Sequence, residues 1–422
     1  MLALYWPWGG EPDGQPAMAQ RLARSLCSGI GGTAAAVNAD GLSFAYRPRG
    51  RPSRRTPTWS PARLDPSLLV VLHGFIDNAD ELRDKLGSST LDESQLYGEA
   101  VQRWGGQADL HVIGDYCSVV ADPAAKRLRL ARSPLRAPPL LYAKDDETVM
   151  AGSVPRTFFA AGWPQELEEK RVVDAAMMNF ADKEGSYFRG LCRVPLGHVV
   201  HLEHGRPRTL VRFYDPMVFG PRDISDADAL RRTAELLDEA VRACLKGSSH
   251  PGFTLSGGLD SAQVVARALD ALPDQRLPTF TFIPEDSFDG IIEPGFIGNE
   301  RAMVDEFAAM HPRLDPHFTT NAGYAHDHRW AEIFHLMSGA PSGMTNMYVC
   351  HGLFASAAAT GCDRLLIGEW GNHAFSDKGS WAYVEYFRTG RWGQLLKALK
   401  AIGGRPRPLW WRFGAHVVLA LL

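Results

Sequence analysis

Hydrophobic residues follow two different spacings along the chain, and the change between them divides it into two parts. In the first part, from Leu68 to Tyr142, short apolar runs such as Leu68–Leu72 and Leu110–Ile113 predict strands, and residues 77–86 between them have helical spacing. A second strand-rich stretch extends from Leu191 to Tyr214. Together these patterns predict an α+β sheet domain.

A boundary is expected between Pro216 and Asp223, where proline, glycine and charged residues cluster. A helix begins after it, with Ser225 or Asp226 available as the N-cap, and Gly247 ends it. The apolar positions predicted to share one face of this helix are Leu230, Ala234, Leu237, Val241 and Leu245.

The second part alternates between strand and helix patterns. The predicted strands are 253–255, 279–283 and 365–367, and the predicted helices are 261–272, 299–310 and 347–359. Such alternation is typical of a parallel, doubly wound sheet, in which ligands bind beyond the carboxyl ends of the strands.

Length and charge narrow the class of protein. A chain of 422 residues is long enough for two or three domains. Its formal net charge of -3 argues against nucleic acid or an anionic membrane as a partner. The six cysteines include no C-x-x-C pair, which favours reduced thiols in a cytoplasmic protein.

Neither end of the chain resembles a targeting or membrane segment. Residues 1–8 lack a basic region and contain a proline, so they do not predict a signal peptide. The apolar run from Phe413 to Leu422 has about half the length of a membrane span. We expect a helix that is truncated at the C-terminus.

The residues from Ser256 to Ser261 have the chemistry of an anion site. Gly257 and Gly258 allow a tight turn and a close approach of the backbone to phosphate, and the N–H groups of the following helix face the anion. The carboxylate of Asp260 would repel phosphate unless Mg²⁺ lay between them. No Walker A sequence occurs in the chain, which disfavours a kinase or ATPase of that type.

This Ser-Gly-Gly-Leu-Asp-Ser string resembles that of the asparagine synthetase family, which includes β-lactam synthetases and lasso-peptide macrolactam synthetases. The resemblance implies that a carboxylate attacks the α-phosphorus of ATP, that pyrophosphate leaves, and that an amine then displaces AMP to form an amide. It also implies a set of nucleotide contacts: Leu255, Ser256, Gly257, Gly258, Leu259, Asp260, Ser261, Ile283 and Gly368. The implied cofactor is Mg²⁺, with Asp260 and Asn372 as ligands.

A second loop, from Leu366 to His373, resembles the S-G-E-G-x-D-E loop of the family. Glu369 falls on the family's glutamate, and the resemblance implies that it helps to deprotonate the attacking amine. Asn372 stands where the family has an aspartate ligand of Mg²⁺, so metal affinity should be lower. His373 replaces the family's second glutamate. The family also supplies a lysine that neutralises phosphate charge, and the sequence assigns it to none of its candidates, Lys378, Lys397 and Lys400.

The first part of the chain is similar to the family's class II glutamine amidotransferase domain. The segments that carry the similarity are 73–82, 114–122, 130–132, 139–142 and 188–197. The resemblance implies an N-terminal-nucleophile-type sandwich over residues 1–218, followed by an ATP-pyrophosphatase domain of the adenine-nucleotide α-hydrolase type over residues 225–422.

Two replacements predict that this first domain does not hydrolyse glutamine. The chemistry needs a cysteine directly after Met1, with its own α-amine as base, and position 2 is Leu2. The family's oxyanion-hole asparagine is replaced by His73.

Three functions remain open. The first is a lasso-peptide-type macrolactam synthetase, whose nucleophile is the substrate's own amine and whose implied partners are a precursor peptide and a cysteine protease. The second is an asparagine synthetase homologue that uses aspartate and free ammonia. The third is a catalytically degenerate scaffold that binds nucleotide or peptide. The first two take a peptide or amino-acid carboxylate as substrate.

Overall fold

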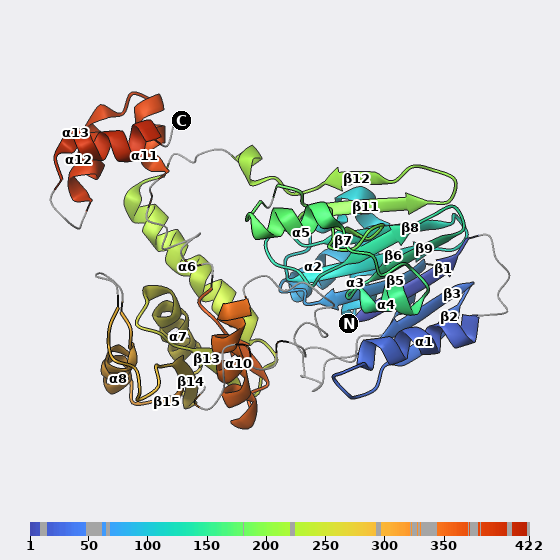
Figure 1. The fold of residues 1–422 in the computed structure, drawn as a ribbon, viewed down its shortest axis with the longest axis horizontal. Coiled ribbons are helices and arrows are strands. Elements are labelled where there is room, and N and C mark those ends of the chain that lie inside the picture. Colours follow the sequence, from blue (N-terminus) through green and yellow to red (C-terminus); the bar gives the residue numbers. More distant parts are fainter. Residues whose placement is uncertain are drawn as a thin grey trace.

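The structure is a computed structural model that describes residues 1–8, 15–47, 61–64, 68–179, 181–219, 224–292, 297–320, 344–369, 381–402 and 407–419, with the single residues 322, 327, 330, 371 and 379. Two units lie side by side: a sandwich of two sheets formed by the first part of the chain, and a smaller sheet with helices formed by the second part (Figure 1).

The sandwich contains two six-stranded sheets whose neighbouring strands are antiparallel. The first has the order β10-β8-β9-β1-β3-β2, formed by β1 (Leu2–Pro7), β2 (Ala35–Ala39), β3 (Leu42–Tyr46), β8 (Leu141–Lys144), β9 (Thr148–Gly152) and β10 (Cys192–Arg193). The second has the order β12-β11-β7-β6-β5-β4, formed by β4 (Ala62–Leu64), β5 (Leu68–Gly74), β6 (Tyr116–Asp122), β7 (Arg127–Arg132), β11 (His198–Glu203) and β12 (Thr209–Arg212).

Helices cover the outer faces of both sheets, which gives a four-layer sandwich. Helix α1 (Gln15–Cys27) packs on the first sheet, and α2 (Ala79–Leu86) and α3 (Glu93–Trp104) pack on the second. The sequence of strand β5 is apolar without alternation because the strand is buried on both faces. Leu69 and Val71 lie in the core between the sheets, whereas Val70 and Leu72 lie under the helices, so both faces of the strand are buried.

Shorter elements complete the sandwich and the connection to the second unit. They are η2 (Gly105–Leu110), α4 (Arg156–Ala160), α5 (Glu169–Ala176) and η3 (Pro216–Phe219). The long helix α6 (Asp226–Leu245) then leads into the second unit (Figure 1).

The second unit contains a four-stranded parallel sheet with the order β15-β14-β13-β16. The strands are β13 (Pro251–Thr254), β14 (Leu277–Phe282), β15 (Leu314–Thr319) and β16 (Arg364–Leu366), and the helices between them include α7 (Leu259–Ala271), α8 (Arg301–Met310) and α10 (Met344–Ala359). The chain moves outward from β13 through β14 to β15 and then returns to the other side of β13. The order therefore reverses between β13 and β16, and this is the position at which open α/β sheets bind ligands.

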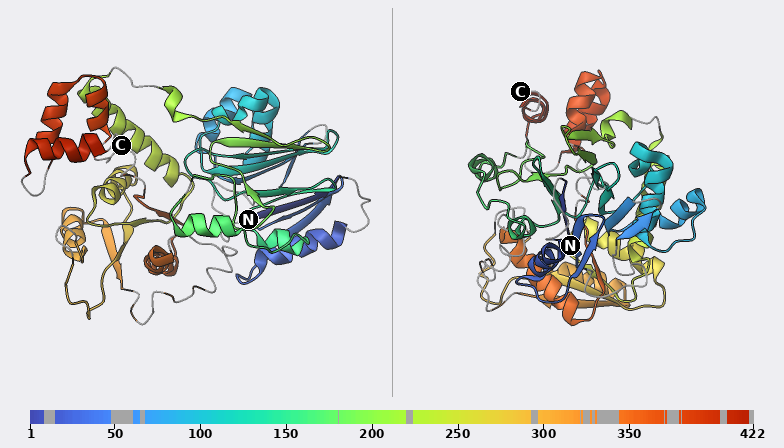
Figure 2. Two further views of the ribbon diagram at one scale, coloured as in Figure 1. Left: turned by 45° about the horizontal axis from the view of Figure 1, so that its top comes forward. Right: turned by 90° about the vertical axis from the view of Figure 1, so that its right-hand side faces the viewer.

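The last described helices form a small separate group at the far end of α6 (Figures 1 and 2). They are α11 (Ala382–Arg388), α12 (Trp392–Ala401), α13 (Leu409–Phe413) and the π-helical turn η5 (Gly414–Val418). Leu395, Leu399 and Val417 form their buried core. In the described part of the chain, we find no helix with the length and apolar character that a membrane crossing requires.

Several features differ from the sequence predictions. The Ser225 hydroxyl does cap α6, accepting the N–H of Asp228 at 3.1 Å, but Leu230 is 73% exposed. Only the later part of this helix reaches the core, where Val241 and Leu245 are buried, so the apolar face was predicted too long. Residues 110–113 form the end of η2 and a turn rather than a strand.

Candidate functional site

The loop from Ser256 to Ser261 connects β13 to α7, beside the point where the strand order reverses. Its two serine side chains hold it closed. The Oγ atoms of Ser256 and Ser261 lie 2.9 Å apart, and the N–H of Ser256 donates to Ser261 Oγ at 3.0 Å. The N–H of Gly258 donates to Ser256 Oγ at 3.2 Å. Hydrogen bonds to its own serine hydroxyls therefore fix the conformation of the loop just before helix α7.

The two glycines of this loop have different surroundings. A Cβ atom at Gly257 would lie 2.5 Å from the sulfur of Met303 on α8, so a larger residue there requires the Met303 side chain to move. Gly258 is the N-cap of α7 and provides no side chain to satisfy the first N–H groups of the helix. These N–H groups and the helix dipole form a place for an anion such as a phosphate.

The second predicted loop packs directly against the first. A Cβ atom at Gly368, which follows β16, would lie 2.6 Å from the backbone nitrogen of Ser261. A Cβ atom at Gly371 would overlap the carboxylate of Asp260. The two loops, more than 100 residues apart in the sequence, therefore lie in contact beyond the carboxyl ends of β13 and β16.

One oxygen of Asp260, Oδ1, is buried, and no donor among the described residues reaches it. A buried carboxylate oxygen without a partner is costly, and a hard divalent cation would satisfy it. Asp260 therefore fits the role of a Mg²⁺ ligand. Asn372, the other predicted ligand, and His373 lie outside the described residues. Within the described residues, no cluster of three or more His, Cys, Asp or Glu side chains is placed to hold a metal.

Leu255 and Ile283 lie at the carboxyl ends of β13 and β14, with side chains 2% and 8% exposed. The N–H of Leu255 donates to the carbonyl of Phe280, and the N–H of Ile283 donates to the carbonyl of Thr319. Both positions are fixed by the sheet beside the loop, and their predicted contacts with a nucleotide stay a prediction.

Glu369 follows Gly368 and faces a cavity of about 730 Å³ between the two units. The Cys350 thiol on α10 is close enough to feel its charge. The pKa of that thiol is raised mainly by burial and then by Glu369. The wall of the cavity on the sandwich side includes Phe75, Asp77, Asp115 and Arg136, and α6 and β16 form much of the other wall. Sequence analysis did not identify this wall, because no motif brings residues of the two units together.

The described part of the amidotransferase-like unit has no reactive thiolate where glutamine hydrolysis would need one. The Leu2 side chain is 1% exposed and packs in the core between the sheets. His73 has its Nδ1 atom 3.9 Å from the sulfur of Cys117 on the neighbouring strand. Burial raises the pKa of Cys117 to about 12, so its thiol stays protonated near neutral pH and is a poor nucleophile.

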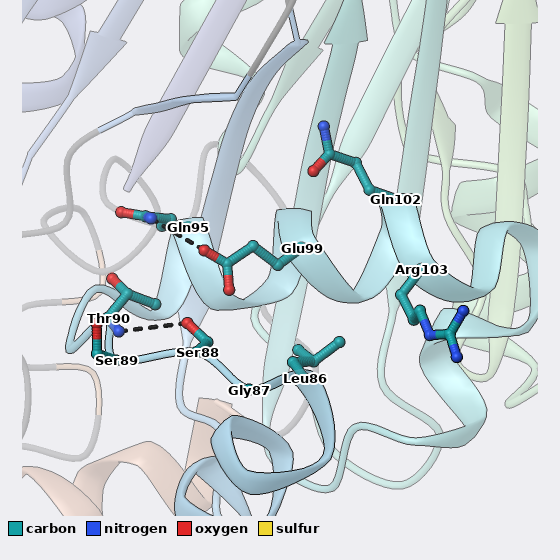
Figure 3. A pocket seen from close by; sticks show the side chains of 9 residues that line it. All are labelled: Leu86, Gly87, Ser88, Ser89, Thr90, Gln95, Glu99, Gln102 and Arg103. Carbon is teal, nitrogen blue, oxygen red and sulfur yellow. Dashed lines mark hydrogen bonds between the residues drawn. The ribbon is translucent and has the colours of Figure 1, made fainter.

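A second open groove, of about 710 Å³, lies between the end of α2 and α3 (Figure 3). Gln95 donates to Glu99 at 2.9 Å along its wall, and the N–H of Thr90 donates to Ser88 Oγ at 3.2 Å. None of the predicted site residues line it.

Comparisons with known proteins match each unit separately. A family model described as a glutamine amidotransferase domain matches residues 61–214, and one described as asparagine synthase matches residues 232–412. A putative glutamine-hydrolysing asparagine synthetase of Mycobacterium tuberculosis is 23% identical over 53% of this chain and 36% of its own length. The glutamine-hydrolysing asparagine synthetase 2 of Bacillus subtilis is 25% identical over 53% of this chain and 32% of its own length. The chain thus spans about a third of the curated relatives that it matches.

Among solved structures, the glutamine phosphoribosylpyrophosphate amidotransferase of B. subtilis is similar with a TM-score of 0.35 and 12% identity, over 72% of this chain and 70% of that one. The allosteric regulatory enzyme of purine biosynthesis has a TM-score of 0.33 and 11% identity, over 72% and 69% of the two chains.

The two matched families occur in the order expected from the sequence. The first match covers the sandwich from β4 to β12, and the second covers most of α6, the parallel-sheet unit and most of the last helices. Together, the two matches and these distant relatives support membership of the asparagine synthetase family, with an amidotransferase-like unit followed by a synthetase-type unit.

Proposed function

We propose that the chain is an ATP-dependent ligase that forms an amide bond through an acyl-adenylate. The observation that carries the proposal is the contact between the two loops, in which Gly368 lies against Ser261 and Gly371 lies against Asp260. It brings an anion-binding helix terminus, a buried carboxylate oxygen and the loop of Glu369 together at one sheet edge.

The proposed reaction has two steps. A substrate carboxylate oxygen attacks the α-phosphorus of ATP, the bond to the β-phosphate oxygen breaks, and pyrophosphate leaves. An amine nitrogen then attacks the acyl carbon, the bond to the AMP oxygen breaks, and AMP leaves. The amine must lose a proton, and Glu369 is the carboxylate that we propose receives it.

The residues of the first loop have separate roles in this proposal. The N–H groups at the start of α7 would hold the pyrophosphate part of ATP while the bond breaks. Mg²⁺, when bound, would neutralise phosphate charge, and Asp260 is the described residue that fits it.

We favour a lasso-peptide-type macrolactam synthetase, in which the amine belongs to the substrate. The support is the burial of Leu2 and of the protonated Cys117 thiol in the amidotransferase-like unit, which leaves no described source of ammonia from glutamine. An asparagine synthetase homologue using free ammonia is the second candidate, supported by the relatives' names. A scaffold that binds nucleotide or peptide without ligation remains the third, because the aspartate ligand of the family is Asn372 here.

Exchange of labelled pyrophosphate into ATP tests the shared first step. It is measured with L-aspartate and with a peptide that carries a side-chain carboxylate. Asp260→Ala should lower the exchange rate at least about a hundredfold. Asp270→Ala, an exposed position on the same helix, is the matched control and should leave it unchanged. Equal rates in the two variants would show that Asp260 takes no part, and no exchange by the wild type would favour the scaffold.

A further inference from the structure

The cavity between the two units lies where the second substrate must arrive. Its lining includes Gly368 and Glu369 of the proposed active site together with Phe75, Asp115 and Arg136 of the amidotransferase-like unit. We infer that this cavity holds the amine-bearing part of an amino acid or peptide, so that the amidotransferase-like unit forms one wall of the acceptor site. The inference rests on the proposed function, since it names the substrate class for the same site.

The size of the cavity fits such a substrate. Its volume is about 730 Å³, whereas a small molecule such as water occupies about 30 Å³ in the liquid. Cavities of roughly 300–1,000 Å³ are typical of sites for organic ligands. The space is therefore much larger than free ammonia needs and fits a substrate that carries its own amine.

The walls combine apolar surface with charge. Pro138 and Phe75 contribute apolar atoms from one unit, and Leu237, Val241 and Val264 contribute them from the other. Such surfaces suit the aliphatic part of an amino acid or peptide chain.

Two of the charged groups on the wall are engaged by the protein. The Asp363 carboxylate accepts hydrogen bonds from Ser248 and Ser249. The Arg364 guanidinium donates to the carbonyl of Cys244 and lies 5.3 Å from the centre of the Phe75 ring.

Asp115 is the carboxylate that is best placed to attract an ammonium group. Its side chain is half-exposed, and its Oδ2 atom lies 3.9 Å from Arg136 Nε, beyond hydrogen-bonding distance. Burial raises the pKa of the Asp115 carboxyl, and the charge of Asp77 adds to this shift in spite of Arg136. A bound cation would relieve the repulsion between these two carboxylates. Neutral ammonia carries no charge and could not form an ion pair with them.

The two walls are held together by contacts between the units. Asp80 on α2 forms an ion pair with Lys246 at the end of α6, and the Arg364 guanidinium lies over Phe75. The sequence far from the synthetase motifs therefore shapes the acceptor side of the site. The amidotransferase-like unit would then help to select the amine substrate, without hydrolysing glutamine itself.

Binding of two matched peptides to the full chain tests the inference. The probes are glycylglycinamide, which has a free ammonium group, and its N-acetylated form, which has none. Calorimetry near neutral pH should give an affinity at least about tenfold higher for the free amine, since one charged hydrogen bond contributes roughly that factor. Asp115→Asn should reduce the difference to about twofold or less.

Two further variants separate the site from a general effect of charge. Ala240→Trp places a large side chain in the cavity from α6 and should abolish binding of both peptides. Asp146→Asn removes an exposed carboxylate of the same unit outside the cavity and should change nothing. Unfolding midpoints within about 2 °C of wild type show that the variants are folded.

Equal affinity for the two peptides, no binding of either to the wild type, or unchanged binding in both Asp115→Asn and Ala240→Trp would overturn the inference. Pyrophosphate exchange is measured on the same samples. Exchange without selective amine binding refutes the acceptor site and leaves the proposed function standing. Selective amine binding without exchange does the reverse.

Discussion

The positions where the two units are expected to carry reactive groups have opposite surroundings. In the first, Leu2 lies in the core between the sheets, and Cys117 is fully buried with a raised pKa. In the second, Gly258 leaves the start of α7 without a capping side chain, and Gly368 lies against the backbone of Ser261. Asp260 there has a buried oxygen that no donor among the described residues reaches. The comparison teaches that the core of the first unit packs around an apolar residue at position 2, whereas the loops of the second unit depend on close backbone contacts at glycine.

The largest effect that we predict concerns the fold of the amidotransferase-like unit. Asp109 is fully buried as an ion pair with Arg129, and it accepts hydrogen bonds from Tyr97 and Tyr116 at 2.8 Å. Asp109→Ala leaves the guanidinium buried without its carboxylate, so we expect a loss of about 3–5 kcal/mol in the free energy of unfolding. Hydrogen exchange at β6 and β7 measures it.

The control for that variant is Glu81→Ala, which removes an exposed carboxylate paired with Lys85 on α2. It should change the stability by less than about 1 kcal/mol. Equal losses in the two variants would show that the buried network does not hold the sandwich together.

The next effect concerns the contact between the two loops of the synthetase-type unit. Gly368→Ala would push a methyl group against the backbone of Ser261, and displacement of a reactive loop by about 1 Å costs roughly a hundredfold in rate. We expect pyrophosphate exchange to fall by that factor. Gly393→Ala on α12 meets no atom within 4 Å and should leave the exchange rate unchanged. An active Gly368→Ala enzyme would refute the role of this contact.

A smaller effect follows from the protonated thiol of Cys117. Its pKa is raised from 9.0 to about 12, so the folded state keeps a proton that the unfolded chain releases. The contribution of this thiol to the free energy of unfolding is present below about pH 9. It is lost as pH rises towards about 12, at up to about 1.4 kcal/mol per pH unit. Cys117→Ala should therefore lose stability less steeply than wild type between those values in chemical denaturation. Parallel curves would show that the thiol does not titrate differently on folding.

The smallest effect concerns the metal. Asn372→Asp replaces a neutral oxygen with an anionic one, so the Mg²⁺ concentration at half-maximal exchange should fall by about threefold to tenfold. A Mg²⁺ titration of pyrophosphate exchange measures it in both proteins. An unchanged titration would place the second ligand elsewhere.

The sequence predicted the first loop well because its chemistry is local. A short strand, two glycines and a helix start are adjacent in the chain, and the structure has them as β13, residues 256–258 and α7. The family resemblance gave Gly368 and this loop as contacts of the same nucleotide, and the structure has Gly368 against Ser261, although the nucleotide contacts themselves stay a prediction.

Other features depend on surroundings that the local pattern does not contain. Strand β15 was not predicted, because Asp315, Pro316 and His317 interrupt its apolar pattern. Proline is tolerated there because β15 lies at the edge of its sheet. The elements from β1 to β3, with α1, were also not predicted. The cavity wall at Phe75 and Asp115 exists only through the packing of one unit against the other.

One reaction tests the contrast between the two units most directly. The full chain is incubated with ATP, Mg²⁺, glutamine and a peptide that has an amino-terminal glycine and an internal glutamate, and pyrophosphate and free glutamate are measured in the same samples. We predict release of pyrophosphate that depends on the peptide, with no glutamate above the level without protein. Sustained glutamate release, or the absence of pyrophosphate in the presence of the peptide, would contradict this account.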